Sequence, residues 1–197
     1  LLMLMNWLNT ASDRTAMPWG MMAYKSTLSG MFYPYARPYE FIVKTFFEPE
    51  LTEWEGLAYT GIFGIITSLA LFTGKAKQLV LNFKRPSQYL ALSGNALLDT
   101  FLWTAVVAAM YGCGRILFIN TEKVLDYLGP LKQLRGIGRF TWLFFYIINI
   151  TGVYFFYHLL QNRKKPVRIL VMGLLAMVVY TDAIANVRLI NDTLNNR

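Results

Sequence analysis

The sequence predicts an all-α membrane protein with about four transmembrane or membrane-embedded helices and an interfacial N-terminal region. Of the 197 residues, 55% are hydrophobic and 15% are charged, a composition that water-soluble domains rarely have. The charges lie in short runs between long apolar stretches, so amphipathic helices do not explain the apolar residues. Two of these stretches each contain one carboxylate, Asp99 and Asp182.

Residues 1–56 form the predicted interfacial or partner-facing region. Pro34, Pro38 and Pro49 prevent one continuous helix there, and the Tyr, Trp and Arg content suits the boundary between lipid and water. The chain begins with Leu1 rather than Met, as expected of a cleaved organellar presequence or of a trimmed sequence. The first explanation makes the mitochondrial inner membrane the leading predicted location.

Residues 57–197 form the predicted helical membrane domain, with candidate spans at 57–73, 87–114, 140–162 and 168–187. The first is short for a hydrocarbon core of about 30 Å, and the second is long enough for a tilted helix. The third is uncharged and strongly aromatic, and it is the clearest span. Small residues at four-residue intervals in the first span favour close approach of another helix; they are Thr60, Gly64 and Ser68.

Polar residues inside the spans are the candidate functional residues. Ionisable and amide side chains are costly in hydrocarbon, so we expect Asp99, Asp182, Asn149 and Asn186 to make polar contacts between packed helices. Trp103 is counted with these packing contacts. The alternative is that Asp99 and Asp182 handle protons or cations.

The formal net charge of +8 fits membrane flanks better than nucleic acid, because the basic residues lie mainly beside the apolar stretches. The densest group, Arg163, Lys164, Lys165 and Arg168, predicts contact with an anionic lipid such as cardiolipin. We therefore expect membrane lipids, and other membrane subunits or further copies of this chain, as partners. No nucleic-acid partner and no cofactor other than a bound lipid is predicted.

No pattern in the sequence indicates an enzyme or a metal site. Cys113 lies between two glycines with no His or acid at a useful spacing, which argues against a nucleophile. His158 is the one histidine of the chain, so a haem or zinc site would lack a second His ligand. The acidic run at residues 48–55 lacks the Glu-x-x-His pairing of carboxylate metal sites.

A short segment of the second span suggests a family. Residues 95–103 read Asn-Ala-Leu-Leu-Asp-Thr-Phe-Leu-Trp. The core Asp99-Thr100-x-Leu102-Trp103 resembles a segment of the peroxin-eleven family of membrane-elongating proteins, and the order of elements over residues 75–190 is similar to that family's. The resemblance implies membrane remodelling and oligomerisation without enzymatic turnover, in the peroxisomal membrane.

Together these patterns predict a non-catalytic structural or accessory subunit of an organellar membrane complex. It would act by helix packing, lipid contact and membrane shaping, in the mitochondrial inner membrane first and the peroxisomal membrane second. Two alternatives stay open at this point. One is an autonomous peroxin-eleven-like remodelling protein, and the other is a small transporter or channel subunit that uses Asp99 and Asp182.

Overall fold

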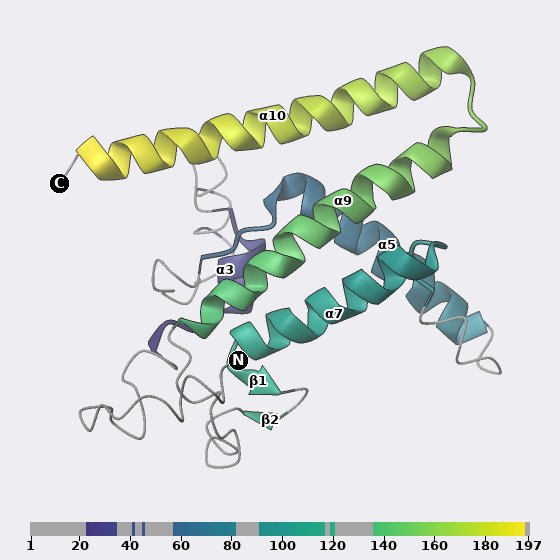
Figure 1. The fold of residues 1–197 in the computed structure, drawn as a ribbon. Coiled ribbons are helices and arrows are strands. Elements are labelled where there is room, and N and C mark those ends of the chain that lie inside the picture. The colour runs from purple at the N-terminus through teal and green to yellow at the C-terminus, as the bar shows by residue number, and fades with distance from the viewer. Residues whose placement is uncertain are drawn as a thin grey trace, which may run out of the picture.

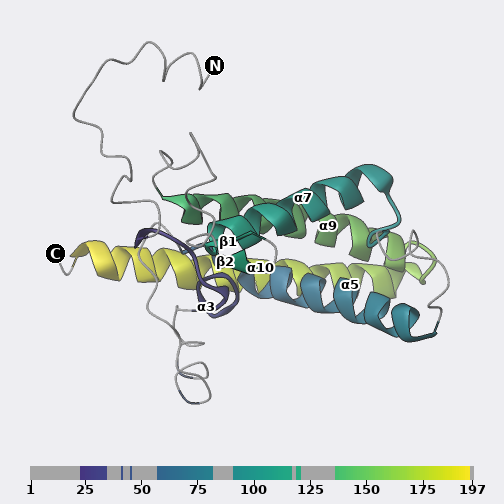
Figure 2. The ribbon, with the colours of Figure 1, turned by 90° about the horizontal axis from the view of Figure 1, so that it is seen from below.

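Helices that alternate in direction make up the computed structural model, and the long ones run side by side (Figures 1 and 2). The structure describes residues 23–34, 41, 45, 57–81, 91–116, 119–120 and 136–195. Most of the predicted N-terminal region therefore lies outside the described residues.

The described elements follow one another along the chain with short connections between the last three. They are α3 (Leu28–Phe32), α5 (Gly61–Leu81), α7 (Ala96–Gly112), the strands β1 (Arg115–Ile116) and β2 (Ile119–Asn120), the 3-10 turn η4 (Ile137–Phe140), α9 (Thr141–Leu160) and α10 (Lys165–Asn195). The two strands pair antiparallel after Gly114, whose φ of 72° reverses the chain. They are the strands of the described segments.

Two of the described helices are long and apolar enough to cross a membrane: Ile137–Leu160, which includes α9, and Lys165–Arg188 of α10. The predicted helical fold is confirmed, with two helices that could span a membrane. The apolar helices Gly61–Gly74 and Ala96–Gly112 are shorter, so the finer prediction of four membrane helices belongs to the proposal below.

The second predicted span, 87–114, differs from the helix observed there. Helix α7 begins at Ala96 because Gly94 has a φ of 82° and Asn95 forms an N-cap. The Asn95 side-chain oxygen accepts the Leu97 and Leu98 N–H groups at 3.0 and 3.3 Å. The helix is therefore shorter than the apolar stretch, and Asp99 lies in its first turn instead of deep within a span.

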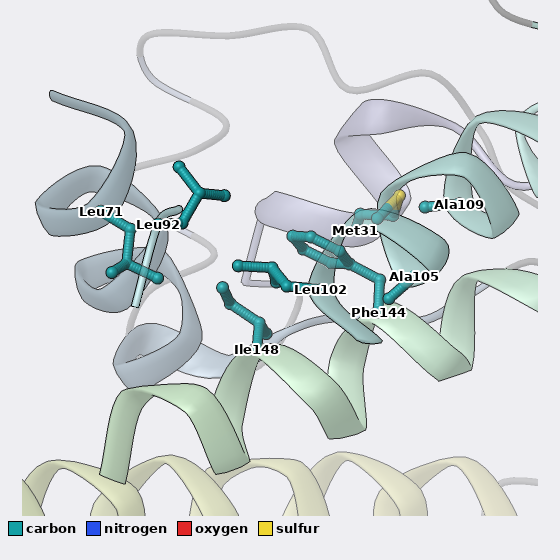
Figure 3. Packing of buried hydrophobic residues seen from close by; sticks show 8 residues of the cluster. All are labelled: Met31, Leu71, Leu92, Leu102, Ala105, Ala109, Phe144 and Ile148. Atoms are coloured by element: carbon teal, nitrogen blue, oxygen red, sulfur yellow. The ribbon is translucent and has the colours of Figure 1, made fainter. Parts of the chain in front are cut away.

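The apolar core lies where α7 and α9 pack together and α3 and α5 cover them (Figure 3). Leu102, Ala105 and Ile148 are completely buried in it, and Met31 of α3 joins them. Trp103 packs against this cluster from its edge.

Glycines allow α9 to approach its neighbours closely. A Cβ atom added at Gly152 would lie 2.3 Å from Thr67 Oγ1 of α5. A Cβ added at Gly112 of α7 would lie 2.7 Å from Thr141 Cγ2. The small-residue face of α5 also meets α9, since a Cβ at Gly64 would lie 3.3 Å from Ile148 Cγ2.

Candidate functional site

Polar groups from three helices meet at the start of α5, a site that we call the polar junction: Met31, Tyr59, Thr60, Gly61, Ile62, Asn149 and Asp182. Asp182 comes from α10, and its Oδ2 accepts the Ile62 N–H at 3.1 Å. The first N–H groups of a helix have no partner within it, and a carboxylate is the acceptor that the helix dipole favours there. Asp182 thus joins α10 to the N-terminus of α5.

Gly61 makes room for this contact. Its φ of 78° turns the chain into α5, and a Cβ atom there would lie 2.8 Å from Asp182 Oδ2. A side chain at this position would be strained by the backbone and would collide with the carboxylate. The Tyr59 side chain also interacts with the Asp182 carboxyl group, which is only 7% exposed.

Asn149 brings α9 into the same junction. Its Nδ2 donates to the Thr60 carbonyl oxygen at 3.1 Å and to the Phe145 carbonyl oxygen at 2.7 Å. Thr60 in turn donates from its N–H and its hydroxyl to the Met31 carbonyl oxygen, at 2.8 and 3.0 Å. The residues just before α5 are therefore fixed by α3 and α9 as well as by α10.

Asn186 and Asp99 make contacts of a different kind. Asn186 lies one turn after Asp182, and its Nδ2 donates to the Asp182 carbonyl oxygen of its own helix at 2.9 Å. The Oδ1 of Asp99 accepts the N–H and the hydroxyl of Ser93, at 2.6 and 2.7 Å. Both contacts satisfy local backbone or side-chain groups rather than linking two long helices.

The structure does not bring the two carboxylates together. Asp182 lies at the start of α5, whereas the start of α7, with Asp99, lies at the end of the molecule where α5 finishes (Figures 1 and 2). Figure 3 shows Leu92, which precedes α7, beside Leu71 of α5. Leu71 lies about 15 Å along α5 from Gly61, at the usual rise per residue. A transport path through both carboxylates stays a prediction from the sequence.

The basic residues predicted to contact lipid lie apart from the junction, in the turn between α9 and α10. Arg163, Lys164 and Lys165 are exposed there, and Arg168 is partly exposed in the first turns of α10. We call these four residues the basic turn.

The outward side of α9 is a second feature of the surface. Five apolar or aromatic side chains, each at least 40% exposed, follow one another at intervals of three and four residues, and we call them the α9 stripe: Leu143, Tyr146, Ile150, Val153 and Tyr157. The buried residues of this helix, such as Phe144 and Ile148, lie on the opposite side and face the core. Each stripe side chain is therefore about half exposed on the surface of the described chain.

Reactive and metal-binding groups are sparse in the described part of the molecule. No group of three His, Cys, Asp or Glu side chains there is placed to hold a metal ion. The Cys113 thiol lies 3.7 Å from the Met31 sulfur. Burial raises the pKa of this thiol to about 11, and the Arg115 charge and a hydrogen bond with Ser26 oppose that rise. His158 is exposed and stacks near Tyr154 and Tyr157. The acidic run at 48–55 lies outside the described residues.

Reasoning from the sequence did not find Tyr59, Gly61 or Ser93 as members of these sites. A signal was present for Ser93, because Ser-Gly-Asn before an apolar run marks a helix start. For Gly61 the signal was a lone glycine before an apolar run, which by itself does not say what approaches it.

The comparisons with known proteins correct the predicted family. The model of a family described as "Domain of unknown function (DUF6311)" matches residues 1–183, and no peroxin-eleven family is found. The peroxin-eleven prediction is therefore wrong, and with it the reason for a peroxisomal location and for an autonomous remodelling protein falls. The motif misled because its residues serve general needs of an apolar helix: Asp99 accepts Ser93 hydrogen bonds in the first turn, and Leu102 fills the core.

No curated protein and no solved structure matches the chain. The family model covers most of the sequence, from residue 1 to residue 183 of 197. The chain belongs to the family described as Domain of unknown function (DUF6311).

Proposed function

We propose that this chain is a membrane-embedded, non-catalytic subunit that joins a larger membrane assembly through the α9 stripe. In this proposal α9 and α10 cross the bilayer, and the shorter apolar parts of α5 and α7 are embedded beside them. The polar junction holds the helices in register, and the stripe packs against an apolar helix of another membrane subunit.

The exposed surface of α10 supports a location in the membrane. Leu170, Ile169 and Val179 are 63%, 61% and 47% exposed, and their spacing places them on three different sides of the helix. Monomeric soluble proteins rarely expose contiguous apolar patches larger than a few hundred Å². Lipid chains around α10 would remove the free-energy cost of exposing these apolar side chains to water. The organelle stays a prediction from the sequence, with the mitochondrial inner membrane first, and membrane shaping stays one as well.

The α9 stripe is the observation that carries the proposal of a partner helix. Its spacing of three, four, three and four residues is the spacing of the seam along which helices pack in coiled coils. The outward side of α7 differs, because Thr100 and Thr104 lie on it and bond to the carbonyl oxygens of Ala96 and Thr100. An uninterrupted apolar seam favours a helix partner along α9 over one along α7.

The experiment compares two substitutions of valine by tryptophan. Val153 in the stripe and Val107 on the outward side of α7 are both 55% exposed, so both variants add the same bulk to an apolar, uncovered position. The chain is expressed in its native host with an affinity tag and extracted in mild detergent. Its assembly size is then measured by native gel electrophoresis and by size-exclusion chromatography with light scattering.

The proposal predicts that the wild-type chain and V107W elute as part of a larger assembly, whereas V153W elutes as the free subunit. A tryptophan in the seam would overfill it, which costs about 1–3 kcal/mol in packed interiors. An unassembled wild-type chain, or a V153W variant that assembles as fully as V107W, would contradict the proposal. Retained wild-type thermal unfolding of free V153W would show that the variant is folded.

A further inference from the structure

The basic turn concentrates positive charge beside two apolar helices. Arg163, Lys164, Lys165 and Arg168 fall within six positions, and Lys165 is the first residue of α10. The first turn of α10 contains no acidic residue. Cations at a helix N-terminus repel the positive end of the helix dipole, so this arrangement is unfavourable without a nearby anion.

The described part of the chain offers no such anion. Its carboxylates are Asp99, Asp182 and Asp192. Asp99 accepts both Ser93 hydrogen bonds and Asp182 binds the N-terminus of α5, while Asp192 lies near the far end of the 31-residue helix α10. A counter-anion of the basic turn would therefore come from outside these residues.

The surroundings of the basic turn indicate what kind of anion fits. Exposed apolar side chains adjoin it on both helices: Leu159 is 55% exposed, Val167 44% and Ile169 61%. Tyr157 and His158, one to two turns before the cations, are exposed as well. Cations beside an apolar collar suit an amphiphile whose anionic head meets the Lys and Arg groups and whose chains cover the aliphatic groups.

We propose that the basic turn binds the phosphate headgroup of an anionic phospholipid, with the acyl chains lying against the exposed side chains of Leu159, Val167 and Ile169. This inference rests on the membrane location in the proposed function, but it does not depend on a partner subunit. The lipid acts as the missing counter-anion of the α10 N-terminus and fixes the depth of both helices at that face of the bilayer.

The test measures lipid preference on the isolated full chain in a neutral detergent. The delipidated chain is incubated with an equimolar mixture of phosphatidylglycerol and phosphatidylcholine, and the ratio of the bound lipids is read by native mass spectrometry. The variant K164Q/K165Q removes two cations of the basic turn. The matched control K25Q/R115Q removes two other exposed cations. They lie at the other end of the helices, since Arg115 follows α7 in β1 and Lys25 adjoins Ser26, whose N–H bonds to the Gly112 carbonyl oxygen.

The wild-type chain and K25Q/R115Q are expected to prefer phosphatidylglycerol. Each cation removed should lower the ratio of bound phosphatidylglycerol to bound phosphatidylcholine about fivefold, so K164Q/K165Q should lower it about 25-fold. Equal preference in all three chains, or a loss in the control as large as in K164Q/K165Q, would overturn the proposal. Inorganic phosphate at the concentration of the lipid should not displace phosphatidylglycerol, and displacement would overturn the assignment to a lipid in favour of a soluble phosphate ligand.

Discussion

The close packing of α9 on α5 at Gly152 gives the sharpest stability prediction. Gly152 of α9 faces α5, where a Cβ atom would lie 2.3 Å from Thr67 Oγ1 and 2.9 Å from Phe63 Cε1. Thr67 is not free to turn away without loss, since its hydroxyl donates to the Phe63 carbonyl oxygen at 2.9 Å. Gly152→Ala must therefore push α9 away from α5 or break this hydrogen bond.

The size of the effect follows from two opposing terms. Overpacking a close contact costs about 1–3 kcal/mol, and replacing a helical glycine by alanine returns about 0.5–1 kcal/mol. We expect a net loss of about 1–2 kcal/mol, which lowers the melting temperature of a chain of this size by about 3–6 °C. Gly173→Ala on α10 is the matched control, because nothing lies within 4 Å of the added Cβ, and it should not lower the melting temperature.

The assay can use the native Cys113 as its reporter. The thiol is partly buried against Met31, so a maleimide dye that fluoresces on reaction reports unfolding as the chain is heated in detergent. Gly152→Ala should melt below the wild-type chain and Gly173→Ala at or above it. Equal melting of both alanine variants would refute the close approach of α9 to α5.

Two further predictions use the polar junction and the thiol. Asp182→Ala removes the acceptor of the Ile62 N–H and should destabilise the chain by about 1–3 kcal/mol in the same assay, whereas Asp182→Asn keeps an acceptor oxygen and should lose less; equal melting of Asp182→Ala and wild type would contradict the contact. Because the pKa of Cys113 is raised to about 11 in the folded chain, its alkylation by iodoacetamide should quicken about tenfold for each pH unit beyond pH 9 up to about pH 11. A plateau near pH 9 would contradict a buried thiol.

Helix content and the position of the most apolar predicted helix were predictable because both depend on local composition. The predicted span 140–162 matches α9 at Thr141–Leu160 closely, since its charged flanks bound the apolar run. The start of α10 at Lys165 was missed by a few residues. Proline is tolerated in the first turn of a helix, so Pro166 does not separate the basic turn from α10 as the hydropathy pattern indicates.

The polar junction was beyond reach of the sequence because it joins residues far apart in the chain. Ile62 and Asp182 are separated by 120 positions, and no local period relates them. Asp99 and Asp182 also look alike in the sequence, as single carboxylates in apolar stretches. Their roles differ because Ser93 lies six residues before Asp99, whereas the partner of Asp182 is a helix start supplied by distant packing.

The polar junction explains how a helix as exposed as α10 keeps one position. In the membrane location proposed above, lipid chains are about as apolar as leucine, so apolar contacts alone give such a helix little preference between the bilayer and its neighbours. The Asp182–Ile62 hydrogen bond is directional, and the missing Cβ of Gly61 leaves space for it at one point along α5. A one-turn slide of α10 would move the Asp182 carboxylate about 5.4 Å away. The carboxylate and the Ile62 N–H would then lose their hydrogen bond. In an apolar setting the free energy lost with this hydrogen bond is large compared with the free energy of exchanging one apolar contact for another. Asp182 therefore sets the register of α10 against α5.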